Sequence, residues 1–188
     1  MSTGSIRALS VVIASALAQW GSIAQADEKP LPTVAKVDLA RYLGTWYELA
    51  RLPMRFEKDC VGVTATYSKR EDGALEVVNR CYKKWLDGEM KESHGRVKVV
   101  DTATNAKLKI SFFGPFCGDY WILDLGESYE YAVVGEPGRD YLWILSRTPS
   151  LPEPKIQALL DRAKEQGFDV SKIYRTPQRI EAPAVAPQ

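Results

Sequence analysis

The chain has 188 residues, of which 25 are Lys or Arg, 24 are Asp or Glu and one is His, giving a formal net charge of +1 at pH 7. This balance argues against nucleic acid as a partner, because the phosphate backbone requires a basic surface. The length suits a single domain with a sizeable core.

The first 26 residues have the three parts of a secretory signal peptide. Arg7 gives a positive start, residues 8–18 form an apolar run, and Ala24 and Ala26 are the small residues of a cleavage site. The apolar run is too short to cross a bilayer as a helix. We therefore expect residues 1–26 to be removed on export across the inner membrane.

No cysteine precedes Cys60, whereas the lipid anchor of a bacterial lipoprotein requires a cysteine at the mature N-terminus. We therefore expect a protein of the periplasm or cell envelope that is not lipid-anchored. Residues 27–36 and 179–188 are rich in Pro and Ala. They should form a flexible N-terminal segment and a disordered tail on either side of one domain over residues 37–178.

Between these ends, apolar and polar residues alternate and turn residues recur, which predicts an all-β protein with antiparallel strands. Short connections, such as Gly114-Pro115 and Pro137-Gly138, indicate an up-and-down meander. Eight tilted strands can close into a β-barrel, and closure removes the two free edges of an open sheet. The expected strands are 45–53, 61–70, 74–83, 94–101, 106–113, 118–125, 129–135 and 140–147.

The pattern changes after the eighth strand. Pro152 and Pro154 open a segment with apolar residues at helical spacing, and Gly167 ends it. We expect one amphipathic helix packed outside the barrel, followed by a short ninth strand within residues 170–174. The apolar positions of the helix are Ile156, Leu159, Leu160 and Ala163.

Three short motifs lie on the expected strands. Gly44-Thr45-Trp46-Tyr47 opens the first strand, Tyr129 and Tyr131 lie at the seventh, and Leu145-Ser146-Arg147 ends the eighth. Together, in this order and with a helix afterwards, they resemble the motifs of the lipocalin family. The stretch 37–178 is similar to the bacterial lipocalin branch, to plant temperature-induced lipocalins and to apolipoprotein D.

The meander brings the start of the first strand and the end of the eighth to one end of the barrel. Trp46 and Arg147 should meet there, with the guanidinium over the indole face. Such a contact would close that end against water. We therefore interpret Gly44, Trp46 and Arg147 as structural residues rather than ligand contacts.

The same threading places Cys60, Cys81 and Cys117 toward the opposite, open end. An oxidising compartment favours one disulfide and leaves one thiol. We predict a Cys60–Cys81 bridge, because neighbouring strands carry these residues. A hairpin with Gly73 in the left-handed conformation would set Cys81 opposite Val63, so the bridge requires a bulge or bend near Cys60.

Alternation along each strand predicts which side chains point into the barrel. For Tyr120 and Val134 the alternation is unclear, and the resemblance to lipocalins implies that they point inward. Apolar surface with a few polar tips is usual for a small-molecule pocket; the alternative is a barrel filled by its own side chains. Glu48 shares the parity of Trp46, and a buried carboxylate would need a partner. The expected ligand-binding residues are Tyr67, Val77, Asn79, Val97, Ile110, Phe112, Tyr120, Val134 and Trp143.

The resemblance implies an exported carrier that stores or moves lipids, with a fatty acid or lysophospholipid as the ligand. We expect no catalysis and no cofactor. His94 is the only histidine, so a metal site has no second histidine to draw on. The chain also has neither a Gly-x-Ser-x-Gly elbow nor a phosphate-binding glycine loop.

Two other functions stay open at this point. One is a barrel enzyme that uses the thiol of Cys81 or Cys117. The other is a protein-binding barrel that acts through its mouth loops, for which an exposed apolar patch is the expected sign. Peripheral membrane contact and a monomer or homodimer are compatible with the sequence. The patch residues that we expect are Leu52, Met54 and Phe56.

Overall fold

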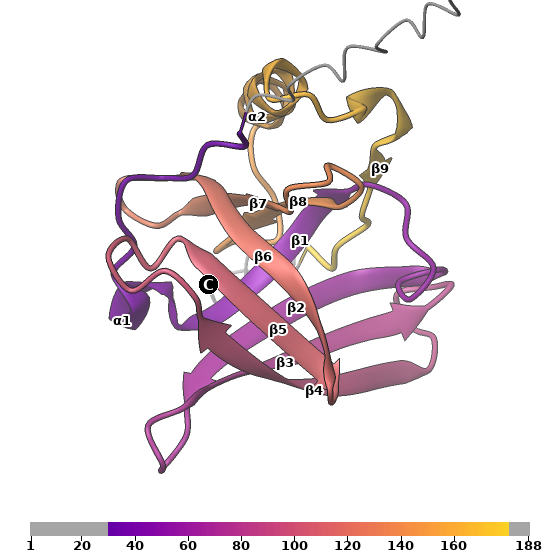
Figure 1. Ribbon diagram of the computed structural model, residues 1–188. Coiled ribbons are helices and arrows are strands. Elements are labelled where there is room, and N and C mark those ends of the chain that lie inside the picture. The colour runs from indigo at the N-terminus through magenta and orange to yellow at the C-terminus, as the bar shows by residue number, and fades with distance from the viewer. Residues whose placement is uncertain (1–29, 181–188) are drawn as a thin grey trace, which may run out of the picture.

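The computed structural model describes residues 30–180, so the expected signal peptide lies outside the described residues. Eight antiparallel strands follow one another around a closed barrel, and one helix lies against its outside (Figure 1). β1 closes the barrel because it pairs with both β2 and β8. The strands are β1 (Gly44–Arg51), β2 (Cys60–Lys69), β3 (Leu75–Lys83), β4 (Met90–Val99), β5 (Lys107–Phe113), β6 (Phe116–Leu125), β7 (Tyr131–Gly135) and β8 (Leu142–Ser146).

The expected fold class is confirmed, and the largest difference in strand bounds is at β4. This strand starts at Met90 rather than at residue 94, because Tyr82 of β3 already pairs with Met90. The first residues of β4 are exposed. Their polar sequence is typical of a loop, although here it belongs to a strand end that water reaches.

Helix α2 (Glu153–Glu165) packs on the outer wall of the barrel (Figure 1). Its four expected apolar residues are all buried, and Gly167 follows it with φ +94°. The outer core combines these residues with outward-facing ones from the barrel, such as Leu123, Val133 and Ile144. The short strand β9 (Tyr174–Arg175) pairs with the end of β1, beside the 3-10 turn η1 (Val170–Lys172). Within residues 30–180, no helix is both long and apolar enough to cross a membrane.

One short helix was not expected from the sequence. Helix α1 (Leu39–Tyr42) has a single turn, and the carboxylate of Asp38 caps it by accepting bonds from the backbone N–H groups of Ala40 and Arg41. Tyr42 is buried, so the turn closes one end of the barrel.

Trp46 and Arg147 meet at this closed end, as predicted. The guanidinium carbon lies 3.8 Å from the indole ring centroid, and Trp46 is fully buried. Arg147 also donates hydrogen bonds to the carbonyl oxygens of Thr45 and Arg41, at 3.0 and 2.7 Å. Gly44 has φ +93°, and a methyl group at this position would lie 3.4 Å from the guanidinium.

The predicted disulfide between Cys60 and Cys81 is present, with a Cα–Cα distance of 5.5 Å. The hairpin register is the one that the sequence predicts, since Arg70 N–H donates to the carbonyl of Ala74. The required bulge lies between Val61 and Thr64, where the register shifts. It brings Cys60 back to Cys81.

The described parts of the two end segments, residues 30–36 and 179–180, contact the barrel. Leu31 is buried in the outer core, and the N–H of Val34 donates to the carbonyl of Ile122 at 3.0 Å. Arg179 stacks over the ring of Tyr82, 4.3 Å from its centroid. Residues 30–36 thus contact the barrel through an apolar side chain and a backbone hydrogen bond, and the start of the tail contacts it through stacking.

Replacement of Arg147 by Ala should lower the free energy of unfolding by roughly 2 kcal/mol, because the cation–π contact and charged hydrogen bonds are lost together. Urea unfolding followed by circular dichroism measures this change. The control is Arg162→Ala, because the guanidinium of Arg162 forms an outer ion pair with Asp124 at 2.8 Å. That exposed pair should contribute less than about 1 kcal/mol. Equal losses in the two variants would contradict the special role of Arg147.

The double change Cys60→Ser and Cys81→Ser should lower the free energy of unfolding by about 3 kcal/mol, because the bridge restricts the unfolded chain. Cys117→Ser should leave stability unchanged, because Cys117 is free and exposed. Thiol titration of the unfolded, unreduced chain should find one thiol. Peptide mapping that shows Cys117 in a bridge would overturn the assignment.

Candidate functional site

Eight of the nine expected ligand-binding side chains lie in one apolar cluster inside the barrel. This inner cluster also contains Trp46 and Tyr42 from the closed end. Asn79 lies two residues after Val77 on β3, and thus on the same inner face. That these residues touch a ligand remains a prediction. The eight are Tyr67, Val77, Val97, Ile110, Phe112, Tyr120, Val134 and Trp143.

Three tyrosines form a floor near the closed end. The hydroxyls of Tyr42 and Tyr120 lie 2.8 Å apart, and the ring centroids of Tyr67 and Tyr120 lie 6.0 Å apart. Burial raises the pKa of each phenol above its ordinary value of 10.0. The floor is therefore neutral at physiological pH and offers hydroxyl groups on an otherwise apolar surface.

The interior changes from closed to open along the barrel axis. Val77 and Val134 are fully buried, whereas the inward-facing Phe112 and Trp143 remain partly accessible. The clearest sign of space is Gly118 on β6, which pairs with Ile110 and shares its inner face. A methyl group at Gly118 would have no atom within 4 Å. Gly118 is exposed, so this space lies at the mouth of the barrel and opens to solvent.

One polar atom in the wall has no partner. The side-chain oxygen of Asn79 is buried and accepts no hydrogen bond within the described residues. An orphaned buried amide oxygen is costly, and a donor on a ligand would satisfy it. Asn79 is therefore the polar position in the expected set with the strongest structural reason to contact a ligand.

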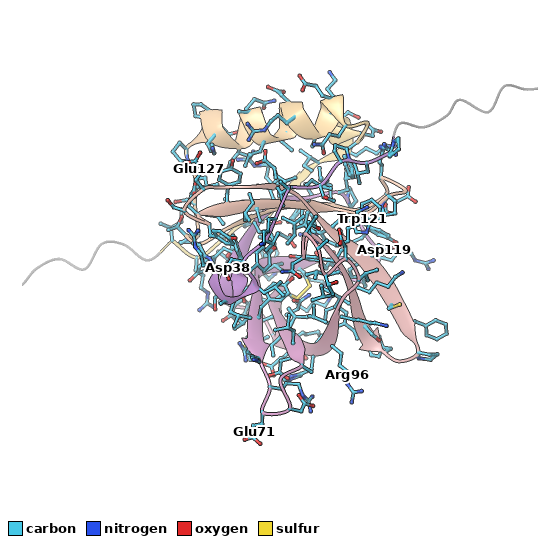
Figure 2. The ribbon with its side chains drawn as sticks, turned by 60° about the vertical axis from the view of Figure 1, so that its left-hand side comes forward. Asp38, Glu71, Arg96, Asp119, Trp121 and Glu127 are labelled. Atoms are coloured by element: carbon cyan, nitrogen blue, oxygen red, sulfur yellow. A yellow bond between two sulfur atoms is a disulfide. The ribbon has the colours of Figure 1, made fainter. Side chains whose placement is uncertain are left out.

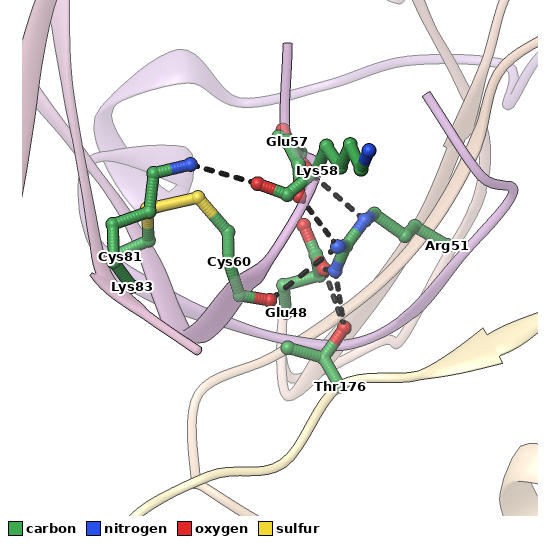
Figure 3. Close-up of a disulfide and its surroundings, with 8 residues drawn as sticks. All are labelled: Glu48, Arg51, Glu57, Lys58, Cys60, Cys81, Lys83 and Thr176. Atoms are coloured by element: carbon green, nitrogen blue, oxygen red, sulfur yellow. Dashed lines mark hydrogen bonds and ion pairs between the residues drawn. A yellow bond between two sulfur atoms is a disulfide. The ribbon is translucent and has the colours of Figure 1, made fainter. Parts of the chain in front are cut away.

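A second polar feature is a charged cluster at the side of the open end, where Arg51 lies between Glu48 and Glu57 (Figure 3). Its guanidinium is 2.6 Å from a Glu48 oxygen and 3.3 Å from a Glu57 oxygen. Thr176, from the C-terminal segment, donates its hydroxyl to Glu48. All four side chains are buried.

The cluster supplies the partner that Glu48 requires, and the sequence did not reveal it. A bulge between Glu48 and Ala50 places both Glu48 and Arg51 on the inner face, opposite Leu145 and Trp143. Without that bulge, residues three apart would point to opposite faces of a strand. The only signal in the sequence was the spacing of Glu48 and Arg51, which is ambiguous by itself.

The pKa of Glu57 is raised well above its ordinary value of 4.5, chiefly by burial and then by the neighbouring charge of Glu48. Arg51 and the side chain of Trp143 oppose the rise. Glu57 therefore holds its proton to higher pH than an exposed carboxyl group does. Its contact with Trp143 connects the charged cluster to the apolar interior.

The mouth loops differ from our expectation. Leu52 and Met54 are buried, so two of the three proposed patch residues are wrong, and only Phe56 is exposed. Leu52 packs into the outer core beside α2 rather than facing the solvent at the mouth. Other exposed aromatic residues include Trp85 on the β3–β4 loop and Phe113 at the end of β5.

The alternative of a barrel enzyme that uses a cysteine thiol is not supported by the positions of Cys81 and Cys117. Cys81 is bonded to Cys60, so it has no thiol. Cys117 is exposed, and it lines a groove on the outer wall together with Lys109 and Ser111. Neither cysteine presents a thiol to the inside of the barrel.

Comparison with known proteins identifies the class. The family model described as a lipocalin-like domain matches residues 37–178. An insecticyanin structure from the tobacco hornworm Manduca sexta has a TM-score of 0.60 at 22% identity, covering 81% of this chain and 85% of that one, and supports the fold. The chain belongs to the lipocalin-like family, whose members are generally binding and transport proteins for small hydrophobic molecules rather than enzymes.

The relatives include all three groups that the sequence resembled, and apolipoprotein D of Mus musculus is 36% identical over 158 residues, which cover 78% of this chain and 80% of the relative. The outer membrane lipoprotein Blc of Escherichia coli K12 is 44% identical over 164 residues, which cover 86% of this chain and 92% of the relative. Temperature-induced lipocalin-1 of Arabidopsis thaliana is 37% identical over 161 residues, covering 81% of this chain and 85% of the relative. The resemblance to the bacterial lipocalin branch is thus confirmed.

These names overturn one expectation. The Blc relatives of Escherichia coli, Citrobacter freundii and Vibrio cholerae are all named outer membrane lipoproteins. This finding contradicts our prediction of a chain that is not lipid-anchored. The prediction rested only on the lack of a cysteine before Cys60, and no positive observation supported it.

The charged cluster makes stability depend on pH in a defined direction. The unfolded chain loses the Glu57 proton near 4.5, and the folded chain loses it at higher pH. The stabilisation is therefore complete below pH 4.5 and is lost as the pH rises through the folded-state pKa. Chemical unfolding across this range should show a smaller fall for Glu57→Gln than for the unchanged chain. The exposed control Glu127→Gln should follow the unchanged chain; identical curves for Glu57→Gln would contradict the assignment.

Proposed function

We propose that the protein binds a molecule with an acyl chain, a fatty acid or a lysophospholipid, inside the barrel and carries it within the cell envelope. The observation that carries the proposal is the open space before Gly118 at the mouth, above a buried apolar interior that ends in the tyrosine floor. The family membership and the name of the Blc relatives support a carrier in the envelope. Catalysis is not part of the proposal.

The wall chemistry suits a chain-shaped apolar ligand with one polar end. The tail would lie among Val77, Ile110, Phe112 and Trp143, where aliphatic and aromatic surfaces alternate around the space. The free oxygen of Asn79 can accept a hydrogen bond from the glycerol hydroxyl of a lysophospholipid, whereas an ionised fatty acid has no donor to offer it. The polar head would remain at the mouth, because the far end is closed by Trp46 and its neighbours.

The affinity should increase with the length of the acyl chain. Each CH₂ group removed from water contributes up to roughly 0.8 kcal/mol, or about fourfold in affinity, before the cost of ordering the chain. Titration with fatty acids and lysophospholipids of increasing length, followed by tryptophan fluorescence and melting temperature, measures this trend. If no length changes either signal, the carrier proposal fails and a filled barrel replaces it.

Trp143 should be the most informative single position. Trp143→Ala should weaken acyl-chain binding by roughly tenfold, because a large aromatic surface is lost from the wall, while the barrel remains folded. The matched control is Trp85→Ala, because Trp85 is 71% exposed on the β3–β4 loop and has no place in the inner cluster. Isothermal titration with one fatty acid compares the two variants. Equal affinities for the two would remove Trp143 from the site.

A further inference from the structure

The charged cluster at the side of the open end holds more acid than base. Glu48 and Glu57 are its two carboxyl groups, and within the described residues both of their ion pairs go to Arg51. The closer contact, at 2.6 Å, joins Arg51 to Glu48, whereas the contact with Glu57 is 3.3 Å long. One guanidinium balances one carboxylate, so an ionised Glu57 adds an uncompensated negative charge to a buried site.

The guanidinium of Arg51 is also engaged by other groups. It donates hydrogen bonds to the hydroxyl of Thr176 at 3.0 Å and to the backbone carbonyl of Glu57 at 2.8 Å, and the ring of Tyr174 lies against it. The Nε atom of Arg51 and the Oε2 atom of Glu57 are buried, and neither forms a hydrogen bond. The Glu57 carboxyl group is therefore the least firmly held member of the cluster.

The groups that face Glu57 come from several elements. Burial is the largest influence on its pKa and raises it; Glu48 of β1 raises it further, whereas Arg51 of β1 and the side chain of Trp143 on β8 lower it. The C-terminal segment adds an uncharged group, the hydroxyl of Thr176, which donates to Glu48. Lys58, the neighbour of Glu57 in the loop, is exposed. Glu57 thus keeps its proton at pH values where an exposed carboxyl group is ionised.

Trp143 connects this carboxyl group to the proposed ligand space. Its side chain contacts the carboxyl group of Glu57, and its ring stacks with that of Tyr120 at a centroid distance of 6.5 Å. Tyr120 belongs to the tyrosine floor, and Trp143 itself lies in the wall of the inner cluster. Glu57 is therefore one side chain away from the space for an acyl chain, at the end where the polar head of the ligand would remain.

We propose that the charged cluster selects acyl ligands by the charge of their head group. While Glu57 is protonated the cluster is neutral, and an anionic head group at the mouth meets no repulsion from it. Once Glu57 is ionised the cluster carries one negative charge, so an anionic ligand binds more weakly and a neutral one is unaffected. The inference rests on the proposed carrier function, which it extends from the acyl chain to the head group.

The coupling acts in both directions. Thermodynamic linkage requires that an anionic ligand that prefers the protonated state also raises the affinity of Glu57 for its proton. At a pH where the free protein has lost this proton, binding of an anionic ligand therefore transfers a proton from the solution to the Glu57 carboxylate. A neutral ligand with the same acyl chain causes no such uptake.

A purely structural cluster would behave differently. The ion pair of Arg51 with Glu48 and the bond from Thr176 to Glu48 join β1 to the C-terminal segment whatever the head group of the ligand is. In that case the stability of the fold would depend on pH, but the ratio of the affinities for an anionic and a neutral ligand would not. This ratio is the quantity that separates the two roles.

The probes for the test are lysophosphatidylglycerol and monoacylglycerol with the same acyl chain. Both offer a glycerol hydroxyl to Asn79, and only the first carries a charge. The variant is Glu57→Gln, which keeps a polar side chain of the same shape without the charge. The control is Glu127→Gln, because Glu127 is exposed on the loop between β6 and β7, and Figure 2 shows it at the edge of the barrel. Isothermal titration of the whole chain from about pH 5 to about pH 9 covers the range of a raised carboxyl pKa.

In the unchanged chain and in Glu127→Gln, the affinity for lysophosphatidylglycerol should fall about tenfold across this range, the effect of one like charge near the head group. The affinity for monoacylglycerol should stay constant. Glu57→Gln should keep the higher affinity for lysophosphatidylglycerol throughout. At the upper end of the range, titration in buffers of different ionisation enthalpy should show proton uptake with lysophosphatidylglycerol in the unchanged chain and none in Glu57→Gln.

An affinity ratio that does not change with pH overturns the selection by charge and leaves the carrier function standing. So does a fall in affinity that persists in Glu57→Gln. If this variant does not fold, the proton uptake of the unchanged chain decides, and its absence with lysophosphatidylglycerol overturns the proposal. Failure of both lipids to bind at any pH overturns the carrier function, and the selection falls with it.

Discussion

The two-sided pairing of β1 closes the barrel, and the rest of the structure depends on it. The first half of β1, from Gly44 to Tyr47, pairs with β2. The second half, from Tyr47 to Arg51, pairs with β8 on its other side. β1 therefore separates from β2 toward the open end, and a seam would be left between them.

The C-terminal segment fills that seam with backbone hydrogen bonds. The N–H of Thr176 donates to the carbonyl of Leu49, and the N–H of Gly62 donates to the carbonyl of Pro177. The side-chain amide of Gln178 then donates to the carbonyls of Glu48 and Val63, both at 2.8 Å. Backbone groups that would otherwise be buried without partners are thus satisfied. This accounts for a segment that crosses from α2 back to the barrel.

Most of the fold and of the inner wall could be predicted from the sequence because both follow from strand alternation. Because the charged side chains of Arg96 and Lys98 must face water, the side chain of Val97 between them points into the barrel. The hairpin register between Arg70 and Ala74 followed from one turn residue. Such patterns have a period of two residues, and a single register error would have reversed every side chain.

The sequence could not reveal the features that depend on broken alternation or on distant partners. The bulge that turns Arg51 inward has no sequence signal, and neither has the approach of Thr176, which lies 128 residues from Glu48. Helix α1 is a single turn, too short for a periodic pattern. The exposure of Phe113 and Phe116 was not predicted, because phenylalanine is usually buried and the sequence carries no sign of a projecting tip.

The seam also decides where the mouth of the barrel is open. On the β1–β2 side, the loop is held by the disulfide at Cys60 and by the Arg51 guanidinium, which donates to the carbonyl of Glu57 at 2.8 Å. On the opposite side, the inward position Ser93 of β4 is exposed, and Gly118 of β6 faces empty space.

One side of the mouth is therefore fixed by a covalent bond and by buried charges, and the other carries neither. The proposed ligand would enter over β4–β6, because Ser93 and Gly118 place little or no side chain at the mouth there. This is the same side on which the β5–β6 hairpin projects, with Phe113 and Phe116 exposed. Access to the interior and the exposed aromatic surface thus follow from one asymmetry, which begins where β1 leaves β2.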